Sequence, residues 1–286
     1  MTLLVDGLAA ISHDYDVVFC DVWGVIHNGV KAFAPPCEAL ARWRRERGPV
    51  VLVSNSPRPS SDVAAQLDSL GVPRSAWSAL VTSGDATRAM LAARAPGPAY
   101  GLGPQRDFSL YEGLGLVFSS MQDAVFIVCT GPVDDEVDVP SDYVEIFKEG
   151  VARGLEMICA NPDRVVQRGD RLIYCAGALA DLYEELGGSV FMAGKPHSPI
   201  YDLGYAMTGT LLAQPLDRRR VLAIGDGVRT DLAGANEQGL DALFIAAGIN
   251  GDLMTGADGA PDVATVEKLL GDGGVSARFV MAELAW

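Results

Sequence analysis

The stretch that decides the fold is residues 17–25, which read VVFCDVWGV. Its apolar start, followed by a turn signal, predicts a strand that is buried on both faces. Asp21 would then lie at the carboxyl end of this strand, which is the edge where parallel α/β sheets bind their ligands. We therefore interpret Asp21 as a candidate functional residue; the structural alternative is an Asp that only caps the turn.

The composition favours two globular domains. The chain has 286 residues, of which 49% are apolar, and this is enough to bury a sizeable core. Thirty-seven acidic and 22 basic side chains give a net charge of -15. This charge would repel nucleic acid and anionic lipid, so we expect no nucleic-acid and no membrane partner. A phosphorylated substrate would need local cations to offset it.

The cysteines indicate a reducing compartment. There are five of them, widely spaced and without a C-x-x-C pair, so we predict reduced core thiols rather than zinc ligands or disulfides. Only three histidines are present, which argues against a nitrogen-rich metal site. The N-terminus has no charged start followed by an apolar run, and no apolar stretch approaches membrane length. We therefore expect a soluble cytoplasmic protein.

Apolar periodicity and turn residues predict alternating strands and helices, as in a parallel α/β fold. The predicted strands after the first are residues 50–53, 80–82, 125–129, 157–160, 172–175, 189–193, 221–224 and 243–247. The predicted helices are residues 35–47, 60–70, 84–94, 142–153, 200–212 and 263–270. The middle third of the chain looks like a separate α/β insertion.

Polar residues follow two further predicted strands. Ser54 and Asn55 end the second strand just before a helix, where hydroxyls and amides near the positive helix end could bind an anion; an ordinary capped connection is the alternative. Asp226 ends a later strand, and Asp231 follows five residues on. Two carboxylates at one strand-to-helix junction repel each other, and Mg²⁺ would relieve the repulsion. The alternative is that they stabilise only the turn and the helix start.

In chain order, Asp21, Ser54-Asn55, Lys195 and Asp226 with Asp231 resemble the haloacid dehalogenase (HAD) superfamily of phosphohydrolases. The most specific match is residues 225–235, GDGVRTDLAGA. Together with Gly194-Lys195-Pro196 it is similar to class IIA, the branch of NagD-type and 4-nitrophenyl phosphatases and pyridoxal phosphatase. Asn161-Pro162-Asp163 resembles the cap signature of that branch. The resemblance implies an α/β fold with a Rossmann-like parallel-sheet core (residues 1–83 and 190–286) and an inserted α/β C2-type cap (residues 84–189).

The resemblance also implies a function: a Mg²⁺-dependent phosphatase that hydrolyses a small phosphomonoester, of the sugar-phosphate or aryl-phosphate class, through an aspartyl phosphate. Asp21 would be the nucleophile and Lys195 would neutralise the phosphoryl group, which donors from Ser54 and the Asn55 backbone would hold. The implied metal ligands are Asp21, the Trp23 carbonyl, Asp226 and Asp231. The cap residues Asn161, Asp163 and Arg164 are candidate substrate contacts, and the resemblance allows a homodimer through the cap.

One position departs from the family pattern. Most phosphatases of this superfamily have a second Asp two residues after the nucleophile, which protonates the leaving oxygen, and here that residue is Trp23. Losing a general acid costs about 10²–10⁴ in rate. Three explanations stay open. His27 replaces the acid, the substrates are aryl or acyl phosphates whose leaving group needs no proton, or the protein is a module that binds a phosphorylated ligand without turnover.

Overall fold

The structure is a computed structural model that describes residues 1–169, 171–212, 215–248 and 260–286. Contacts divide the chain into two compact units. The first unit comprises Met1–Ser54, Ala64–Val81 and Tyr201–Trp286, and the second comprises Asn55–Val63 and Thr82–Ile200. The second unit thus includes residues 55–63, 82–83 and 190–200 in addition to the predicted cap segment.

The first unit is built on a seven-stranded sheet with the order β1-β13-β12-β11-β2-β3-β4. Its strands are β1 (Leu3–Leu4), β2 (Val17–Cys20), β3 (Val50–Ser54), β4 (Ala79–Thr82), β11 (Val221–Gly225), β12 (Asp241–Ile245) and β13 (Phe279–Met281). The pairings β1–β13, β13–β12, β12–β11, β11–β2 and β2–β3 are all parallel. Every residue of β2, β3 and β11 is buried, as the apolar runs predicted. The predicted α/β fold with a parallel sheet is confirmed.

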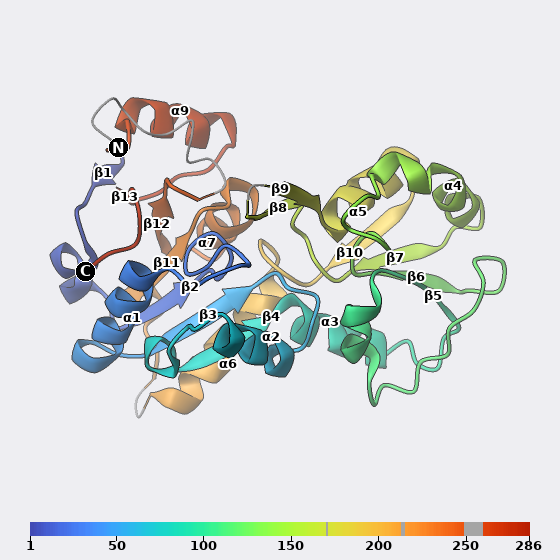
Figure 1. The fold of residues 1–286 in the computed structure, drawn as a ribbon, viewed down its shortest axis with the longest axis horizontal. Helices are drawn as coiled ribbons and strands as arrows, with labels where there is room; N and C mark the ends of the chain where they lie inside the picture. Colours follow the sequence, from blue (N-terminus) through green and yellow to red (C-terminus); the bar gives the residue numbers. More distant parts are fainter. Residues whose placement is uncertain (170, 213–214, 249–259) are drawn as a thin grey trace. The chain divides into compact units, whose positions relative to one another are not determined.

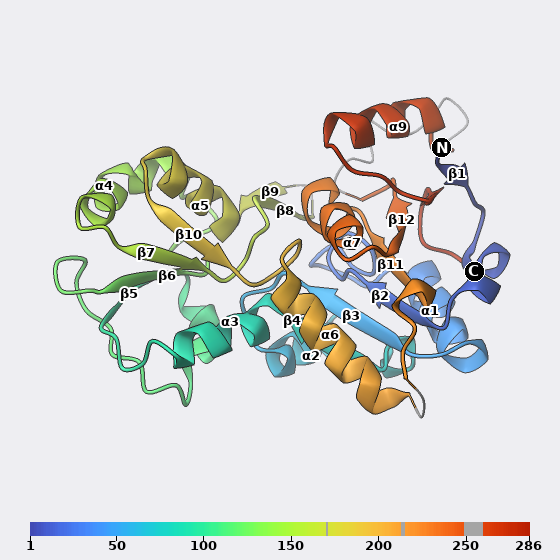
Figure 2. The same cartoon turned by 180° about the vertical axis from the view of Figure 1, so that it is seen from behind.

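Helices alternate with these strands. They are α1 (Ala34–Glu46), α2 (Ser60–Ser69), α6 (Ser198–Leu211), α7 (Ala233–Glu237) and α9 (Val263–Asp272), and α2 and α6 each begin in the second unit. Two prolines occupy the first turn of α1, where their missing N–H groups cost nothing, and Trp43 on its buried face is fully enclosed. Opposite views show α9 beside β1 and β13 (Figures 1 and 2), where Thr2 N donates to Glu267 Oε1 at 2.8 Å.

The second unit has its own parallel sheet, in the order β10-β7-β6-β5, and a separate antiparallel pair, β8–β9. Its strands are β5 (Ala99–Leu102), β6 (Phe126–Cys129), β7 (Glu156–Cys159), β8 (Val165–Arg168), β9 (Arg171–Tyr174) and β10 (Ser189–Met192). Its α-helices are α3 (Ser83–Ala92), α4 (Val144–Ala152) and α5 (Ala176–Glu185), and the 3-10 helices η4 (Gln105–Tyr111) and η5 (Pro140–Tyr143) connect strands.

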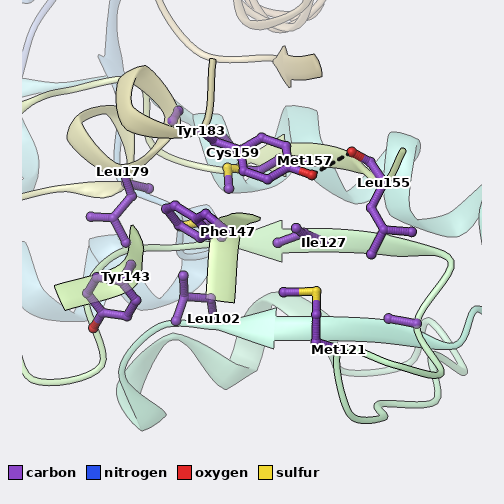
Figure 3. Packing of buried hydrophobic residues seen from close by; sticks show 14 residues of the cluster. Leu102, Met121, Ile127, Tyr143, Phe147, Leu155, Met157, Cys159, Leu179 and Tyr183 are labelled. Atoms are coloured by element: carbon purple, nitrogen blue, oxygen red, sulfur yellow. Dashed lines mark hydrogen bonds between the residues drawn. The ribbon is translucent and has the colours of Figure 1, made fainter. Parts of the chain in front are cut away.

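Apolar clusters pack on both faces of the second unit's sheet. Alternate residues of β6 belong to different clusters, Ile127 to one and Val128 to the other. Figure 3 shows the larger cluster, in which Phe147 lies between two tyrosine rings. Its ring centroid is 5.9 Å from that of Tyr143 and 5.3 Å from that of Tyr183. The Tyr183 hydroxyl donates to the Leu155 carbonyl at 2.7 Å, so this polar atom is satisfied inside the core.

Residues 172–175, which were predicted as an apolar strand, differ from the prediction in their pairing and in their exposure. They form most of β9, which pairs with β8 and not with the four-stranded sheet. Leu172 is 65% exposed and Tyr174 is 40% exposed, and only Ile173 is buried within the strand. Among the strands and α-helices of the second unit, β5, β8 and α5 were not predicted.

All five cysteine side chains are buried, and none of these described residues forms a disulfide, as predicted. Burial raises the pKa of the Cys129 thiol to about 12, which keeps it protonated and unreactive. Over the part of the chain that the structure describes, no helix is both long enough and apolar enough to cross a membrane.

Candidate active site

Parallel pairing of β2 with β11 brings two carboxylates to one edge of the sheet. Cys20 is the register partner of Ile224, and the Asp21 amide donates to the Ile224 carbonyl at 2.8 Å. Both strands therefore end at the same level. Asp21 directly follows β2, and Asp226 directly follows β11.

A third carboxylate joins these two. Carboxylate oxygens of Asp21, Asp226 and Asp231 all lie within 4.8 Å of one another, and none of the three residues is more than 8% exposed. Asp231 lies in a π-helical turn (Val228–Leu232), and its Oδ2 accepts the Gly227 amide at 3.1 Å. Three negative charges so close together in a buried place repel strongly unless a cation is bound among them. Hard carboxylate oxygens in this arrangement fit Mg²⁺.

Glycines allow the backbone to approach these carboxylates. Gly24 has φ of +87°, and a Cβ there would overlap Oδ2 of Asp226. A Cβ on Gly225 would overlap the Asp231 carboxylate, and one on Gly248 would overlap Asp226. Gly225 begins the stretch 225–235 that resembles the family, whereas no motif of the sequence pointed to Gly248, which lies after a different strand.

The loop after β2 folds back on itself. Trp23 and His27 form an isolated bridge, and their rings meet edge to face with centroids 5.0 Å apart. His27 is only 1% exposed, and its Nδ1 accepts the Gly29 amide at 2.9 Å, which places the proton of the neutral ring on Nε2. The Trp23 side chain packs over Gly29, since a Cβ there would lie 2.6 Å from ring atom Cη2. The second residue after Asp21 thus carries an indole that packs against its own loop.

The predicted phosphate-binding residues follow β3. Leu52 is the register partner of Cys20, so Ser54 ends β3 at the same edge as Asp21, and it is 7% exposed. Asn55 begins the second unit and is 2% exposed. The sequence predicted that Asn55 lies at the start of a loop. It did not predict the hydrogen bonds that the Asn55 side chain makes.

In the second unit, Asn55 and Lys195 are bound together. The Lys195 amide donates to Asn55 Oδ1 at 2.7 Å, and Asn55 Nδ2 donates to the Lys195 carbonyl at 3.1 Å. Asn55 Nδ2 also donates to Asp163 Oδ1 at 2.9 Å. Lys195 is 3% exposed. A lysine so deeply buried differs from the solvated surface lysine that is common for this residue type.

The predicted cap contacts form one turn. Asn161 Oδ1 accepts the Asp163 amide at 3.1 Å. The Arg164 guanidinium makes a two-pronged ion pair with Asp181 of α5, at 3.0 and 2.7 Å, and also donates to the Pro162 carbonyl. The hydrogen bonds to Asp181 raise the pKa of Arg164 above its ordinary value. The structure thus uses Arg164 to hold the turn on α5, and its contact with substrate stays a prediction.

A further charged cluster of the second unit was not predicted. Asp107 of η4 is 4% exposed, and its Oδ1 lies 3.8 Å from Arg58 Nε and 4.0 Å from Arg106 Nε. Burial raises the pKa of the Asp107 carboxyl, although both arginines oppose this shift. Burial likewise lowers the pKa of Arg58. Residues 105–111 have no strand or helix periodicity that could have drawn attention to Asp107.

The structure therefore brings Asp21, Asp226 and Asp231 together in the first unit, and Asn55, Asp163 and Lys195 together in the second. Ser54, Trp23 and His27 lie in the first unit, and Asn161 and Arg164 in the second.

Two family profiles match the chain. One is described as haloacid dehalogenase-like hydrolase and covers residues 18–117, and the other, described as HAD-hydrolase-like, covers residues 192–270. A D-glycerol 3-phosphate phosphatase of Mycobacterium tuberculosis is 22% identical over 266 residues. That match includes 85% of this chain but 66% of the relative, so the chain spans just under two thirds of that protein's length.

Solved structures give a stronger match. A hydrolase of the haloacid dehalogenase-like family from Brucella suis 1330 is 41% identical, with a TM-score of 0.88 over 99% of this chain and 100% of that one. A possible sugar phosphatase from Cytophaga hutchinsonii (18% identity, TM-score 0.79, 98% of both chains) shares the fold. So does a p-nitrophenyl phosphatase from Archaeoglobus fulgidus (19% identity, TM-score 0.70, 94% of this chain and 97% of that one), which is named for an activity of the predicted branch. The family resemblance read from the sequence is confirmed, and the chain belongs to the haloacid dehalogenase-like family of hydrolases.

Proposed function

We propose that this protein is a Mg²⁺-dependent phosphatase that hydrolyses a small phosphomonoester, of the sugar-phosphate or aryl-phosphate class, through an aspartyl phosphate. The observation that carries the proposal is the convergence of three buried carboxylates, one of them Asp21, at the carboxyl edge of a parallel sheet. Phosphatase names among the relatives and structural neighbours support the same reaction class.

The proposed chemistry has two steps. A carboxylate oxygen of Asp21 attacks phosphorus, and the bond to the leaving oxygen breaks with its electron pair. Water then attacks phosphorus in the aspartyl phosphate, which releases inorganic phosphate and restores Asp21. The Ser54 hydroxyl and the backbone N–H of Asn55 donate to the phosphoryl oxygens, and the Lys195 ammonium offsets the charge of these oxygens.

The acidic cluster supports Mg²⁺ as the cofactor. Asp21, Asp226 and Asp231 would hold the ion together with the Trp23 carbonyl. When bound, it supplies positive charge beside the phosphoryl group, which lowers the barrier for attack by an anion on an anion. Asp21 would hold the ion through one carboxylate oxygen and would attack phosphorus with the other.

Trp23 limits which phosphate esters the proposed enzyme should hydrolyse well. An indole donates no proton to a leaving oxygen, so esters of acidic alcohols, such as aryl phosphates, should react best. His27 remains the proposed alternative acid, acting through Nε2, because Nδ1 is engaged by Gly29. The His27→Ala variant decides between these two routes: lost turnover supports His27 as the acid, and unchanged turnover removes it.

The proposal extends to the organisation of the chain. Residues 1–83 and 190–286 would act as the core domain, and residues 84–189 as a cap that excludes water and contributes specificity. The substrate would be a small phosphorylated metabolite in the cytoplasm, with Asn161, Asp163 and Arg164 as candidate contacts. A homodimer through the cap is the proposed assembly.

The test is hydrolysis of 4-nitrophenyl phosphate with Mg²⁺ and with EDTA. We expect turnover that needs Mg²⁺ and that Asp21→Asn abolishes. The matched control is Asp202→Asn, which removes an exposed carboxylate on α6 and should leave turnover unchanged. Metal-independent turnover, or turnover that survives Asp21→Asn, would contradict the proposal.

Trp23 also favours a second candidate function: a module that binds a phosphorylated ligand without hydrolysing it. Such a module would show tight, Mg²⁺-dependent binding of phosphorylated metabolites and no turnover of 4-nitrophenyl phosphate or of natural phosphates. The same assay therefore separates the two functions.

A further inference from the structure

The side chain of Asn55 is fully used by groups of the second unit. Its Oδ1 accepts the Lys195 amide, and its Nδ2 donates both to the Lys195 carbonyl and to Asp163 Oδ1. A flipped amide would place its oxygen against two acceptors and its NH₂ against a donor. The three partners therefore fix one orientation of Asn55.

Asp163 is itself held in place. Its amide donates to Asn161 Oδ1, and its carbonyl accepts the Gly177 amide at 3.0 Å. Arg164, the next residue, is anchored to Asp181. The carboxylate of Asp163 is thus presented to Asn55 from a turn that is fixed on both sides, and a hydrogen bond to an ionised acceptor is stronger than a neutral one.

The packing around this contact leaves little room for movement. A Cβ on Gly194 would lie 2.6 Å from Asn55 Oδ1 and 2.6 Å from Ser83 Oγ, and 2.8 Å from Cδ of Pro162. Gly194, the residue before Lys195, is therefore enclosed by Asn55, by Ser83 and by Pro162, which precedes Asp163. Because Asn55 is 2% exposed and Lys195 is 3% exposed, water competes little for these bonds.

We propose that Asp163 is a positioning residue, which orients the Asn55 amide and through it fixes the backbone from which the Lys195 side chain extends. This inference rests on the proposed function, in which Lys195 neutralises the phosphoryl group. It assigns Asp163 a role common to every phosphorylated ligand, in contrast to a contact with one substrate.

The two roles make different predictions for Asp163→Ala. If Asp163 is a positioning residue, its replacement by Ala lowers kcat/KM by a similar factor, at least about tenfold, for all phosphomonoesters. The replacement also weakens competitive inhibition by inorganic phosphate. If Asp163 instead contacts one substrate, its replacement changes the ratio of kcat/KM values between substrates and leaves inhibition by inorganic phosphate unchanged. Asp163→Asn keeps an oxygen that accepts from Asn55, so it should restore most of the activity that Asp163→Ala loses.

A second measurement needs no turnover. Hydrogen exchange of the Lys195 amide, followed in a peptide spanning residues 193–200, should become faster in Asp163→Ala and return toward the wild-type rate in Asp163→Asn. The matched control is Asp123→Ala, which removes another carboxylate of the second unit, one that accepts from Ser120 Oγ at 3.0 Å. This control should change neither the exchange nor the kinetics.

The outcomes separate this inference from the proposed function. If the wild type hydrolyses no phosphomonoester, the proposed function fails, and the exchange data still decide whether Asp163 orders the Lys195 backbone. Unchanged exchange in Asp163→Ala overturns the inference. So does a loss that differs between substrates, or an Asp163→Asn variant as impaired as Asp163→Ala.

Discussion

Trp23 lies two residues after the candidate nucleophile Asp21, so its chemistry bears directly on the proposed reaction. Its ring packs over Gly29 and edge-on against His27. An indole N–H is too weak an acid to donate a proton to a leaving oxygen. Its effect on the rate therefore depends on how much the leaving group needs a proton.

Trp23→Asp should accelerate hydrolysis of esters with basic leaving groups, by about 10²–10⁴, and should accelerate 4-nitrophenyl phosphate much less. The measurement is the dependence of log kcat/KM on the pKa of the leaving alcohol, which should be steep for the wild type and shallow for the variant. Trp23→Phe is the control, because it keeps an apolar ring and adds no acid. Equal acceleration of both classes would refute a missing proton donor.

Gly24 lets the backbone approach the Asp226 carboxylate more closely than a residue with a Cβ would allow. Its φ is +87°, and its missing Cβ is the space occupied by Oδ2 of Asp226. Gly71 is a matched control, since its φ is +84° and nothing lies within 4 Å of a Cβ there.

Gly24→Ala and Gly71→Ala should both lose about 1–2 kcal/mol of stability from the unfavourable backbone conformation. Only Gly24→Ala should also weaken Mg²⁺ binding, by at least about tenfold in Kd, because it displaces the Asp226 carboxylate. Isothermal titration with Mg²⁺ measures the difference. Equal Mg²⁺ affinity in the two variants would show that the close approach does not matter.

At the scale of elements, the pair β2–β11 is fastened at the end opposite to the carboxylates. Arg220 precedes β11, and its guanidinium holds both carboxylate oxygens of Asp16, which precedes β2, at 2.6 and 2.7 Å. The Asp16 amide also donates to the Arg220 carbonyl at 2.8 Å. This ion pair joins the two strands in the register that brings Asp21 level with Asp226.

The ion pair predicts a pH dependence of stability. Hydrogen bonding from Arg220 holds the pKa of Asp16 below its ordinary value of 3.8, against the opposing effect of partial burial. A lowered folded-state pKa stabilises the protein above pH 3.8, and this stabilisation disappears as the pH falls through the folded-state pKa.

Asp16→Asn should therefore reduce the free energy of unfolding at pH 6, by at most about 1 kcal/mol because the pair is partly exposed. The difference from the wild type should shrink at pH 3, as measured by urea denaturation. Asp68→Asn is the control, since Asp68 makes a two-pronged pair with Arg74 only six residues away, and its loss should not affect the pairing of β2 with β11. A constant difference at both pH values would contradict this account.

The sequence predicted the elements that carry chemistry better than those that surround them. The strands before Asp21, Ser54 and Asp226 are uniformly apolar and end in turn residues, so their ends could be located and their meeting at one edge expected. The strand β8 and the helix α5 lack so clear a pattern. The use of the Asn55 side chain could not be predicted, because its partners lie 108 and 140 residues further along the chain.

At the scale of the whole molecule, each unit has its own sheet, and the second unit has its own apolar clusters on both faces of that sheet. Phe147 is fully buried at the centre of the larger cluster (Figure 3). A change there should act on one unit and spare the other.

Phe147→Ala should cost about 3–5 kcal/mol of the stability of the second unit, because it removes a large ring from a closed core. Hydrogen exchange should accelerate in β6, β7 and α5, while β2, β3 and β11 keep their protection. Phe108→Ala is the control, since Phe108 lies in the same unit and is 53% exposed. Equal loss of protection in both sheets would show that the units unfold together.

The exposed pair β8–β9 has a consequence for divergence within the family. Leu172 and Tyr174 project from it, while the interior of the second unit closes without them. Natural variation can therefore replace these two side chains at little thermodynamic penalty, and the acidic triad of the other sheet is encoded elsewhere in the gene. The exposed side chains of this pair of strands and the acidic triad are thus free to evolve at separate rates.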